Sequence, residues 1–303
     1  MDNQCDYLVI GANGLIGAAV AKELDAAPGA HNWVGTSFKR RSSRFRSLNI
    51  LDKENIKKVF QEVKPKTVLF CSNLAGGVEF AQTHPAEAKK FYYEATQDLG
   101  EQCLKHRARL VFISTECVFD GKKEVYREED EPNPLNLYGQ WKTESEKWIT
   151  KHLADSLIVR TMFVFGWQPE TVTPNAVMKA YFSVSKKERM LVQAYRWGTP
   201  TYVQDLAKAM VELSVSGADG IYHVTGSTFI TRYEWLKKVC RAMEWDSSWL
   251  CPLTEISPKA TPYPLKLRLD TQKFRRQFKI KLHSLDESMF LFKNDTLIPS
   301  RSL

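Results

Sequence analysis

The chain has 303 residues, of which 43% are hydrophobic and 26% charged, a composition typical of globular proteins. No apolar run approaches the roughly 20 residues that a membrane-spanning helix needs, so we expect no membrane partner. The formal net charge of +8 would suit nucleic acid, but it attracts phosphorylated small molecules equally well and selects neither by itself. The length fits one large α/β domain or two interleaved lobes.

The N-terminal segment carries no basic residues before the strand-like run at residues 7–10. It therefore predicts no signal peptide, and we expect a cytoplasmic protein. The six cysteines are scattered, without a Cys-x-x-Cys pair or a patterned histidine nearby. We interpret them as reduced, mostly buried thiols and expect neither a disulfide framework nor a metal site.

Apolar, β-rich runs alternate with amphipathic stretches along the first half of the chain. The predicted strands cover residues 7–10, 31–35, 67–71, 109–114 and 156–161. The predicted helices, in which apolar residues recur at three- and four-residue spacing, cover residues 15–26, 53–63, 86–106 and 135–152. This alternation is typical of an α/β fold with a Rossmann-type, doubly wound parallel sheet.

A looser pattern follows residue 166. Residues 168–175 are rich in Pro and Thr, and strand-like runs around Leu191 and Tyr222 each precede a helical stretch. We predict a Rossmann domain over residues 1–166 and a smaller α/β C-terminal lobe over 167–303, with segments around 190–225 returning to the Rossmann domain. Four prolines in residues 252–264 predict an extended loop.

A glycine pattern, Gly11-x-x-Gly14-x-x-Gly17, follows the first predicted strand and opens the first predicted helix. Glycine suits this turn because a side chain would hold the backbone away from a pyrophosphate, whose charge is met by free N–H groups and the helix dipole. The spacing differs from G-x-G-x-x-G, and a tight strand-to-helix turn is the alternative interpretation. The loop predicts a dinucleotide site formed by Gly11, Asn13, Gly14, Leu15, Ile16 and Gly17.

A basic segment follows the second predicted strand: Ser37 is followed by Lys39, Arg40 and Arg41, and no acid appears until Asp52. A carboxylate here would repel the 2′-phosphate of NADP, whereas guanidinium groups bind it through charge-assisted hydrogen bonds. The segment therefore favours NADP(H) over NAD(H), with these five residues as cofactor contacts. A solvated basic loop or a nucleic-acid patch is the alternative; we expect no nucleic-acid partner.

Tyr138 and Lys142 stand one helical turn apart on the same face, so the ammonium group can lower the pKa of the phenol. Ser114 and Thr115 end the preceding strand, and one of the two hydroxyls should reach the site because successive strand side chains alternate. We expect Thr115. As an isolated pattern Tyr-x-x-x-Lys also arises by chance between surface residues, but in this context it predicts an acid/base pair.

Together these motifs resemble the extended short-chain dehydrogenase/reductases, and within them the dTDP-4-dehydrorhamnose reductase group, which includes the regulatory beta subunit of methionine adenosyltransferase. The resemblance spans nearly the whole chain and is also carried by residues 118–121, 160–161, 198–207 and 220–226. It implies an NADPH-dependent oxidoreductase of deoxysugar biosynthesis that reduces a 4-keto (6-deoxy) sugar attached to a nucleotide. In the implied mechanism Tyr138 protonates the ketone oxygen, Thr115 stabilises the developing oxyanion, and Lys142 holds the cofactor's ribose. Tyr138 and Lys142 are therefore also expected to contact the cofactor.

The substrate positions depart from that group. The replacements are Glu94 for the usual Asn, Glu116-Cys117 for Asp-Tyr, Tyr195-Arg196 for Asp-Gln, and Tyr263-Pro264 for Arg-Pro. The substrate implied by the resemblance is therefore a nucleotide sugar, but not necessarily dTDP-4-dehydrorhamnose.

Five residues are predicted to contact the substrate. Glu116 and Cys117 follow the catalytic strand, and Asn175 matches a substrate contact of the family. Arg268 could meet the diphosphate of a nucleotide sugar as a bidentate donor, and Trp167 at the lobe junction could stack on a base or sugar.

Two alternatives stay open. A non-catalytic, NADP-binding regulatory subunit is suggested by the basic segment, by the altered substrate positions, and by residues 126–130 and 134–138, which its relatives share. A sugar-nucleotide epimerase or dehydratase needs an additional acid/base group near Thr115, and Glu116 could serve as one. A homodimer also stays open.

Overall fold

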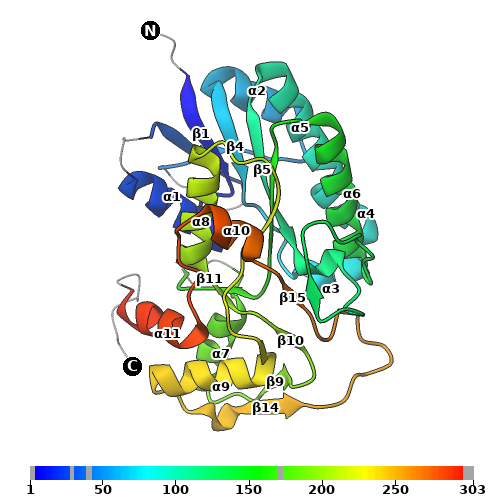
Figure 1. The fold of residues 1–303 in the computed structure, drawn as a ribbon, viewed down its shortest axis with the longest axis vertical. Helices are drawn as coiled ribbons and strands as arrows, with labels where there is room; N and C mark the ends of the chain where they lie inside the picture. Colours follow the sequence, from blue (N-terminus) through cyan, green and yellow to red (C-terminus); the bar gives the residue numbers. More distant parts are fainter. Residues whose placement is uncertain (1–3, 28–30, 39–42, 169–172, 296–303) are drawn as a thin grey trace.

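The computed structural model describes residues 4–27, 31–38, 43–168 and 173–295 (Figure 1). Its centre is a seven-stranded sheet in the order β12-β7-β5-β4-β1-β2-β3, with every neighbouring pair parallel. The strands are β1 (Cys5–Ile10), β2 (Trp33–Ser37), β3 (Arg46–Ser47), β4 (Pro65–Phe70), β5 (Arg109–Thr115), β7 (Leu157–Thr161) and β12 (Gly220–His223). The predicted doubly wound, Rossmann-type sheet is confirmed.

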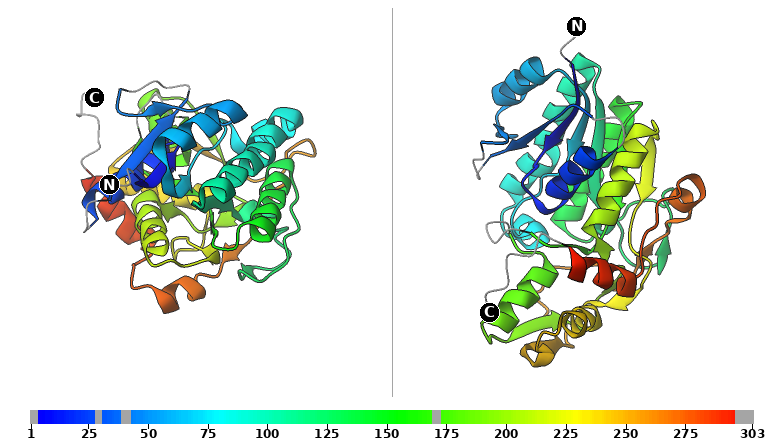
Figure 2. Two further views of the ribbon diagram at one scale, coloured as in Figure 1. Left: turned by 90° about the horizontal axis from the view of Figure 1, so that it is seen from above. Right: turned by 90° about the vertical axis from the view of Figure 1, so that its left-hand side faces the viewer.

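Helices cover both faces of this sheet (Figures 1 and 2). One face packs against α1 (Leu15–Ala26) and α8 (Val203–Val215), and the other against α2 (Lys53–Val63), α5 (Ala95–His106) and α6 (Leu137–His152). β1 supplies both cores, because its side chains alternate: Tyr7 and Val9 face the first layer, and Leu8 and Ile10 the second. Burial on both faces explains the continuous apolar runs of these strands.

A smaller lobe lies beyond the carboxyl ends of the strands, at the lower end of Figure 1. Its aromatic core is built by helices α7 (Ala176–Ser185), α9 (Arg232–Met243) and α11 (Leu285–Asn294) and by the strand pair β9 (Met190–Gln193) and β14 (Leu250–Leu253). The 3-10 turn η3 (Ser247–Trp249) leads into β14 and buries no residue. No helix of the described residues has the length and apolarity to cross a membrane.

Short elements connect the two parts. Three two-stranded pairs are β8 (Val164–Phe165) with β11 (Thr201–Tyr202), β10 (Trp197–Gly198) with β13 (Ile230–Thr231), and β6 (Val125–Tyr126) with β15 (Arg268–Leu269). The remaining elements are α3 (Gly77–Thr83), α4 (Pro85–Lys89), the π-helix η1 (Lys90–Glu94), the 3-10 turn η2 (Glu116–Val118) and α10 (Gln272–Gln277).

The chain passes between the two parts more than once. α8 packs against α1 and β12 pairs with β7, so this stretch lies in the Rossmann layers. β9, however, pairs with β14 in the smaller lobe, so the expected return around residues 190–225 begins too early. A second return was not expected: Phe274 of α10 joins the core beneath α1 and α8. Periodicity identifies a strand but not the sheet that it joins.

A buried ion pair fastens α6 to the sheet. The guanidinium Nη2 of Arg160 on β7 lies 2.7 Å from the Glu146 carboxylate on α6, and the two side chains are 2% and 4% exposed. Arg160 Nε also donates to this carboxylate, and the guanidinium carbon lies 5.0 Å from the centre of the Phe119 ring. Removing one partner would leave an uncompensated buried charge.

We therefore expect Glu146→Ala to lower the free energy of unfolding by about 3–5 kcal/mol, measured by urea denaturation. Glu144→Ala is the matched control on the same helix: its carboxylate pairs with Lys147 at 3.1 Å, but both side chains are exposed. This control should cost less than about 0.5 kcal/mol. Equal losses for the two variants would contradict the role assigned to the buried pair.

Candidate active site

The glycine loop makes a close turn between β1 and α1. Gly11 has a φ of +85°, and a Cβ there would collide with the side chain of Ser72, which follows β4. A Cβ on Gly17 would overlap the Gly11 carbonyl. Gly14, the N-cap of α1, offers no side-chain hydrogen bond, so the N–H groups of the first helical turn, from Leu15 on, stay free for an anion. This backbone cradle fits the diphosphate of a dinucleotide.

The cradle lies at the topological switch point of the sheet. β1 pairs with β2 on one side and with β4 on the other, so the chain crosses over in opposite directions from this strand. In open α/β sheets the crevice outside the carboxyl ends at such a point is where ligands bind. The smaller lobe stands opposite the same ends (Figure 1).

The structure describes only part of the basic segment that is predicted to select NADP(H). Ser37 is buried at the end of β2, whereas residues 39–41, namely Lys39, Arg40 and Arg41, lie outside the described residues. Asp52 is the N-cap of α2, where its carboxylate accepts the Asn55 N–H at 3.0 Å. The nearby Arg44 is paired with an aspartate of α1 at 2.9 Å. Selectivity for NADP(H) therefore stays a prediction that depends on residues 39–41.

The predicted catalytic residues meet where β5 ends. Asn136 caps α6 by accepting the Gly139 N–H at 2.9 Å, and a Cβ on Gly139 would overlap the carbonyl of Cys117 just after β5. The first turn of α6 is thus held directly against the segment that follows Thr115. This contact brings the Tyr138 phenol close enough to Thr115 for the hydroxyl to lower the phenol's pKa.

Lys142 is buried one turn further along α6. Its Nζ donates to the Ile113 carbonyl at 2.8 Å and lies 4.3 Å from the centre of the Phe112 ring. Burial lowers its pKa to about 7, against the opposing effect of the Glu146 carboxylate.

The pKa of Tyr138 is raised well above its usual value, chiefly by burial. Neighbouring acidic groups, including Glu116, raise it further. The expected lowering of this pKa by Lys142 is therefore wrong for this structure, because desolvation dominates and Lys142 itself gives up its proton near neutrality. At neutral pH the phenol is protonated.

The low pKa of Lys142 predicts a pH-dependent stability. Its folded value of about 7 lies below the ordinary 10.5, so between these values the unfolded chain binds more protons. Stability relative to Lys142→Met should therefore rise with pH from about 7 to about 10, by up to about 1.4 kcal/mol per unit. Urea denaturation of both proteins across this range tests this prediction. Lys147→Met, at an exposed site on the same helix, is the control: the stability of the unaltered protein relative to this variant should not change with pH in the same way.

Glu116 occupies the space next to Thr115. Its buried carboxylate accepts the Thr115 hydroxyl at 2.8 Å and pairs with Nη2 of Arg196 at 3.0 Å. The Arg196 guanidinium in turn lies 3.9 Å from the centre of the Tyr263 ring. Three of the positions that depart from the reductase pattern are therefore in direct contact. Burial raises the pKa of the Cys117 thiol to about 12, which makes it a poor nucleophile.

The other predicted substrate residues lie elsewhere. Trp167 is core: it stacks on Phe292 at 4.4 Å and its indole N–H donates to the Phe292 carbonyl, so the guess that it meets a ligand is wrong. The side-chain oxygen of Asn175 caps α7, and its amide N–H donates to a nearby backbone carbonyl. Both ends of this side chain are therefore used in holding the fold together. Arg268 is exposed and faces Glu124 at 4.0 Å, not the residues around Thr115.

One supporting residue gave no signal in the sequence. Tyr92 lies in the π-helix η1, a rare element that often occurs at functional sites. Its ring packs edge-on against Tyr138 at 5.0 Å, and its hydroxyl donates to Asn73 at 2.7 Å. Glu94, at the end of the same π-helix, is half-exposed and pairs with Lys89.

Comparison with solved structures agrees with this architecture. The dTDP-4-dehydrorhamnose reductase from Bacillus anthracis, solved in complex with NADP, superposes with a TM-score of 0.83 and 23% identity, covering 95% of this chain and 98% of that one. The UDP-glucose 4-epimerase from Thermus thermophilus, in complex with NAD, gives 0.79 and 21%, covering 96% and 99%. At these identities the likeness shows the fold.

Sequence comparison identifies the family. The methionine adenosyltransferase 2 subunit beta of Xenopus tropicalis is 30% identical over 277 residues, 89% of this chain and 81% of that protein. The spore coat polysaccharide biosynthesis protein SpsK of Bacillus subtilis is 28% identical, covering 85% and 86%. The model of the RmlD substrate binding domain matches residues 5–296. The resemblance to the dTDP-4-dehydrorhamnose reductase group is thereby confirmed, and the chain belongs to the RmlD substrate binding domain family.

Proposed function

We propose that the chain is an NADPH-dependent reductase of a nucleotide-activated 4-keto (6-deoxy) sugar. The observation that carries this proposal is the meeting of Thr115, Tyr138 and Lys142 at the end of β5, on the same edge of the sheet as the glycine cradle. A phenol that keeps its proton at neutral pH is suited to donate it, which is the role that ketone reduction requires. The family and the relative SpsK, named for polysaccharide biosynthesis, support a sugar substrate.

Each residue then has a distinct task. The glycine loop and the first turn of α1 would hold the cofactor's diphosphate, and residues 39–41 its 2′-phosphate. The nicotinamide, when bound, supplies hydride to the ketone carbon. Tyr138 would give its proton to the ketone oxygen, and the Thr115 hydroxyl, turned from Glu116, would donate to the same oxygen as charge develops. Lys142, held by the Ile113 carbonyl, would direct another N–H to the ribose.

We expect Tyr138→Phe to lower kcat by about 10²–10⁴-fold, the usual contribution of a general acid, while leaving the Kd for NADPH unchanged within about twofold. The decrease in NADPH absorbance with a panel of nucleotide 4-keto sugars measures this. Tyr93→Phe is a matched control, because that hydroxyl belongs to η1 and accepts a hydrogen bond from Gln97. A panel that shows no turnover with the unaltered protein would reject the reductase.

For cofactor choice, Arg40→Ala should weaken NADPH binding by about tenfold, the loss of one charge-assisted hydrogen bond to phosphate, and leave NADH binding unchanged. Calorimetric titration of both cofactors gives the ratio. Arg241→Ala, which removes an exposed arginine from α9 in the smaller lobe, is the control. An unaltered ratio of the two affinities in Arg40→Ala would defeat the interpretation of the basic segment.

A non-catalytic, NADP(H)-binding regulatory subunit is the second candidate. The observation in its favour is that the Thr115 hydroxyl donates to Glu116, so its only proton is already engaged. The relative named as a subunit of methionine adenosyltransferase 2 adds support. Two results together would favour this candidate over the reductase. The protein would bind NADPH without turning over any sugar of the panel, and cells that lack the protein would show a phenotype that cells carrying Tyr138→Phe do not show.

A further inference from the structure

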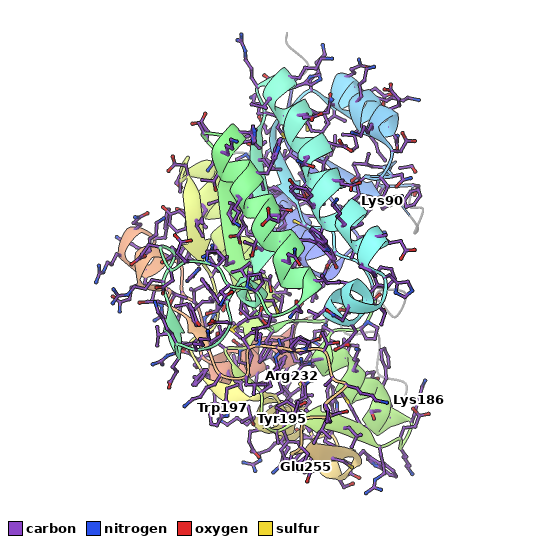
Figure 3. All side chains as sticks on the ribbon, turned by 90° about the vertical axis from the view of Figure 1, so that its right-hand side faces the viewer. Lys90, Lys186, Tyr195, Trp197, Arg232 and Glu255 are labelled. Carbon is purple, nitrogen blue, oxygen red and sulfur yellow. The ribbon has the colours of Figure 1, made fainter. Side chains whose placement is uncertain are left out.

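Two arginines of the smaller lobe lie against one aromatic ring. The guanidinium carbons of Arg196 and Arg232 are 5.1 and 5.2 Å from the centre of the Phe163 ring. The backbone joins them as well, because the Arg232 N–H donates to the Arg196 carbonyl at 2.9 Å. Arg232 opens α9, while Arg196 precedes β10. Figure 3 shows Arg232 in the same part of the lobe as Tyr195 and Trp197, the neighbours of Arg196 in the chain.

The charges of this cluster do not balance. Glu116 pairs with Arg196 through Nη2, and no other side-chain hydrogen bond of Arg196 to the described residues is present. In the part of the chain that the structure describes, Arg232 makes no ion pair and its guanidinium donates no hydrogen bond. Glu79, on the other side of Tyr263, accepts hydrogen bonds from the hydroxyls of Tyr263 at 3.0 Å and of Thr261. Two cations therefore share one carboxylate.

Both arginines lie in surroundings that are electrostatically unfavourable for a positive charge. Arg196 is only 4% exposed, whereas Arg232 is partly exposed. Arg232 is the first residue of a helix, where the macrodipole repels positive charge. Burial and the neighbouring Arg196 lower the pKa of Arg232 to about 10, which shows the same unfavourable field. The guanidinium group stays charged at neutral pH despite this, and a bound anion would offset the unfavourable field.

The ring between them is itself held in a rare conformation. Phe163 has a φ of +46°, in the left-handed region that bulky residues seldom occupy. Its ring stacks on Trp235 at 5.8 Å with an interplanar angle of 3°, and a Cβ on Gly198 would strike it at 2.6 Å. The ring thus offers both guanidinium groups one fixed aromatic surface. Strain of this kind persists only where the surrounding structure imposes it, and it concentrates at ligand sites.

We infer that Arg196 and Arg232 form a subsite that binds an oxyanion of the ligand held between the lobes, a phosphoryl or carboxylate group. The free donors of two guanidinium groups suit the paired oxygens of either group. Glu116 links this subsite to Thr115 through one carboxylate, so two hydrogen bonds separate Arg196 from the predicted reaction centre. The inference rests on the proposed function only for the presence of a ligand between the lobes.

The test is calorimetric binding to the NADPH-loaded full-length protein. Pyrophosphate and dTDP probe a phosphoryl group, glucuronate probes a carboxylate, and thymidine is the neutral control. We expect at least one oxyanion to bind, and Arg232→Gln to raise its Kd by about tenfold or more without changing thymidine or NADPH binding. Arg232→Lys should restore part of the affinity, since it restores the charge but not the fork of donors. Lys237→Gln, an exposed site on the same helix, should bind like the unaltered protein.

The inference is overturned if no oxyanion binds the unaltered protein, or if Arg232→Gln binds as tightly as the unaltered protein while circular dichroism shows it folded. Arg196→Gln combined with Glu116→Gln gives a second variant without an unpaired buried charge, should Arg232→Gln fail to fold. Affinity equal to that of the unaltered protein in this double variant also overturns the inference. Oxyanion binding without turnover would reject the reductase but leave the subsite standing.

Discussion

The site depends on one close contact, that of Gly139 with the carbonyl of Cys117. Because only a residue without a Cβ fits there, α6 can approach the segment after β5 closely enough for Tyr138 to reach Thr115. The next two contacts along the helix follow from it. Lys142 meets the Ile113 carbonyl, and Glu146 meets Arg160. The spacings of three and four residues put Gly139, Lys142 and Glu146 on one face of α6. The same face therefore packs against the sheet, carries a predicted catalytic residue and forms the buried ion pair.

Burial of this stripe sets the protonation states. Lys142 packs against β5 and Tyr138 against Tyr92, and both lose hydration, which disfavours the ammonium and the phenolate alike. The pKa of Tyr138 is consequently raised and that of Lys142 lowered, so the phenol is the more strongly protonated of the two groups. An acid that keeps its proton until the transition state is appropriate for reduction, whereas oxidation would need the phenolate. The packing of α6 thus leaves the phenol protonated at neutral pH, the form that the proposed reductase needs.

The sequence predicted the features that are local. The alternation of strand and helix patterns defined the parallel sheet, and the Tyr-x-x-x-Lys spacing is a property of a single helix. Prediction from the sequence failed for features that depend on tertiary packing. The direction of the pKa shift of Tyr138 follows from what covers the phenol, and Trp167 looks the same in the sequence whether it faces a ligand or the core. Arg232 could not be connected with Arg196 either, because only the fold makes them neighbours.

The departures from the reductase pattern at Glu116, Arg196 and Tyr263 are best understood as one change. Glu116 at its buried position requires a cation, Arg196 supplies it, and the Tyr263 ring covers the guanidinium. Any one of these residues alone would leave a buried charge or an unfilled surface, with a cost of several kcal/mol for an unpaired ion. The stability of the fold is enough to keep these charges matched, so the pairing of Glu116 with Arg196 does not by itself require a ligand. The unpaired Arg232 has no such structural partner among the described residues, and it is this residue that argues for a site adapted to a different ligand.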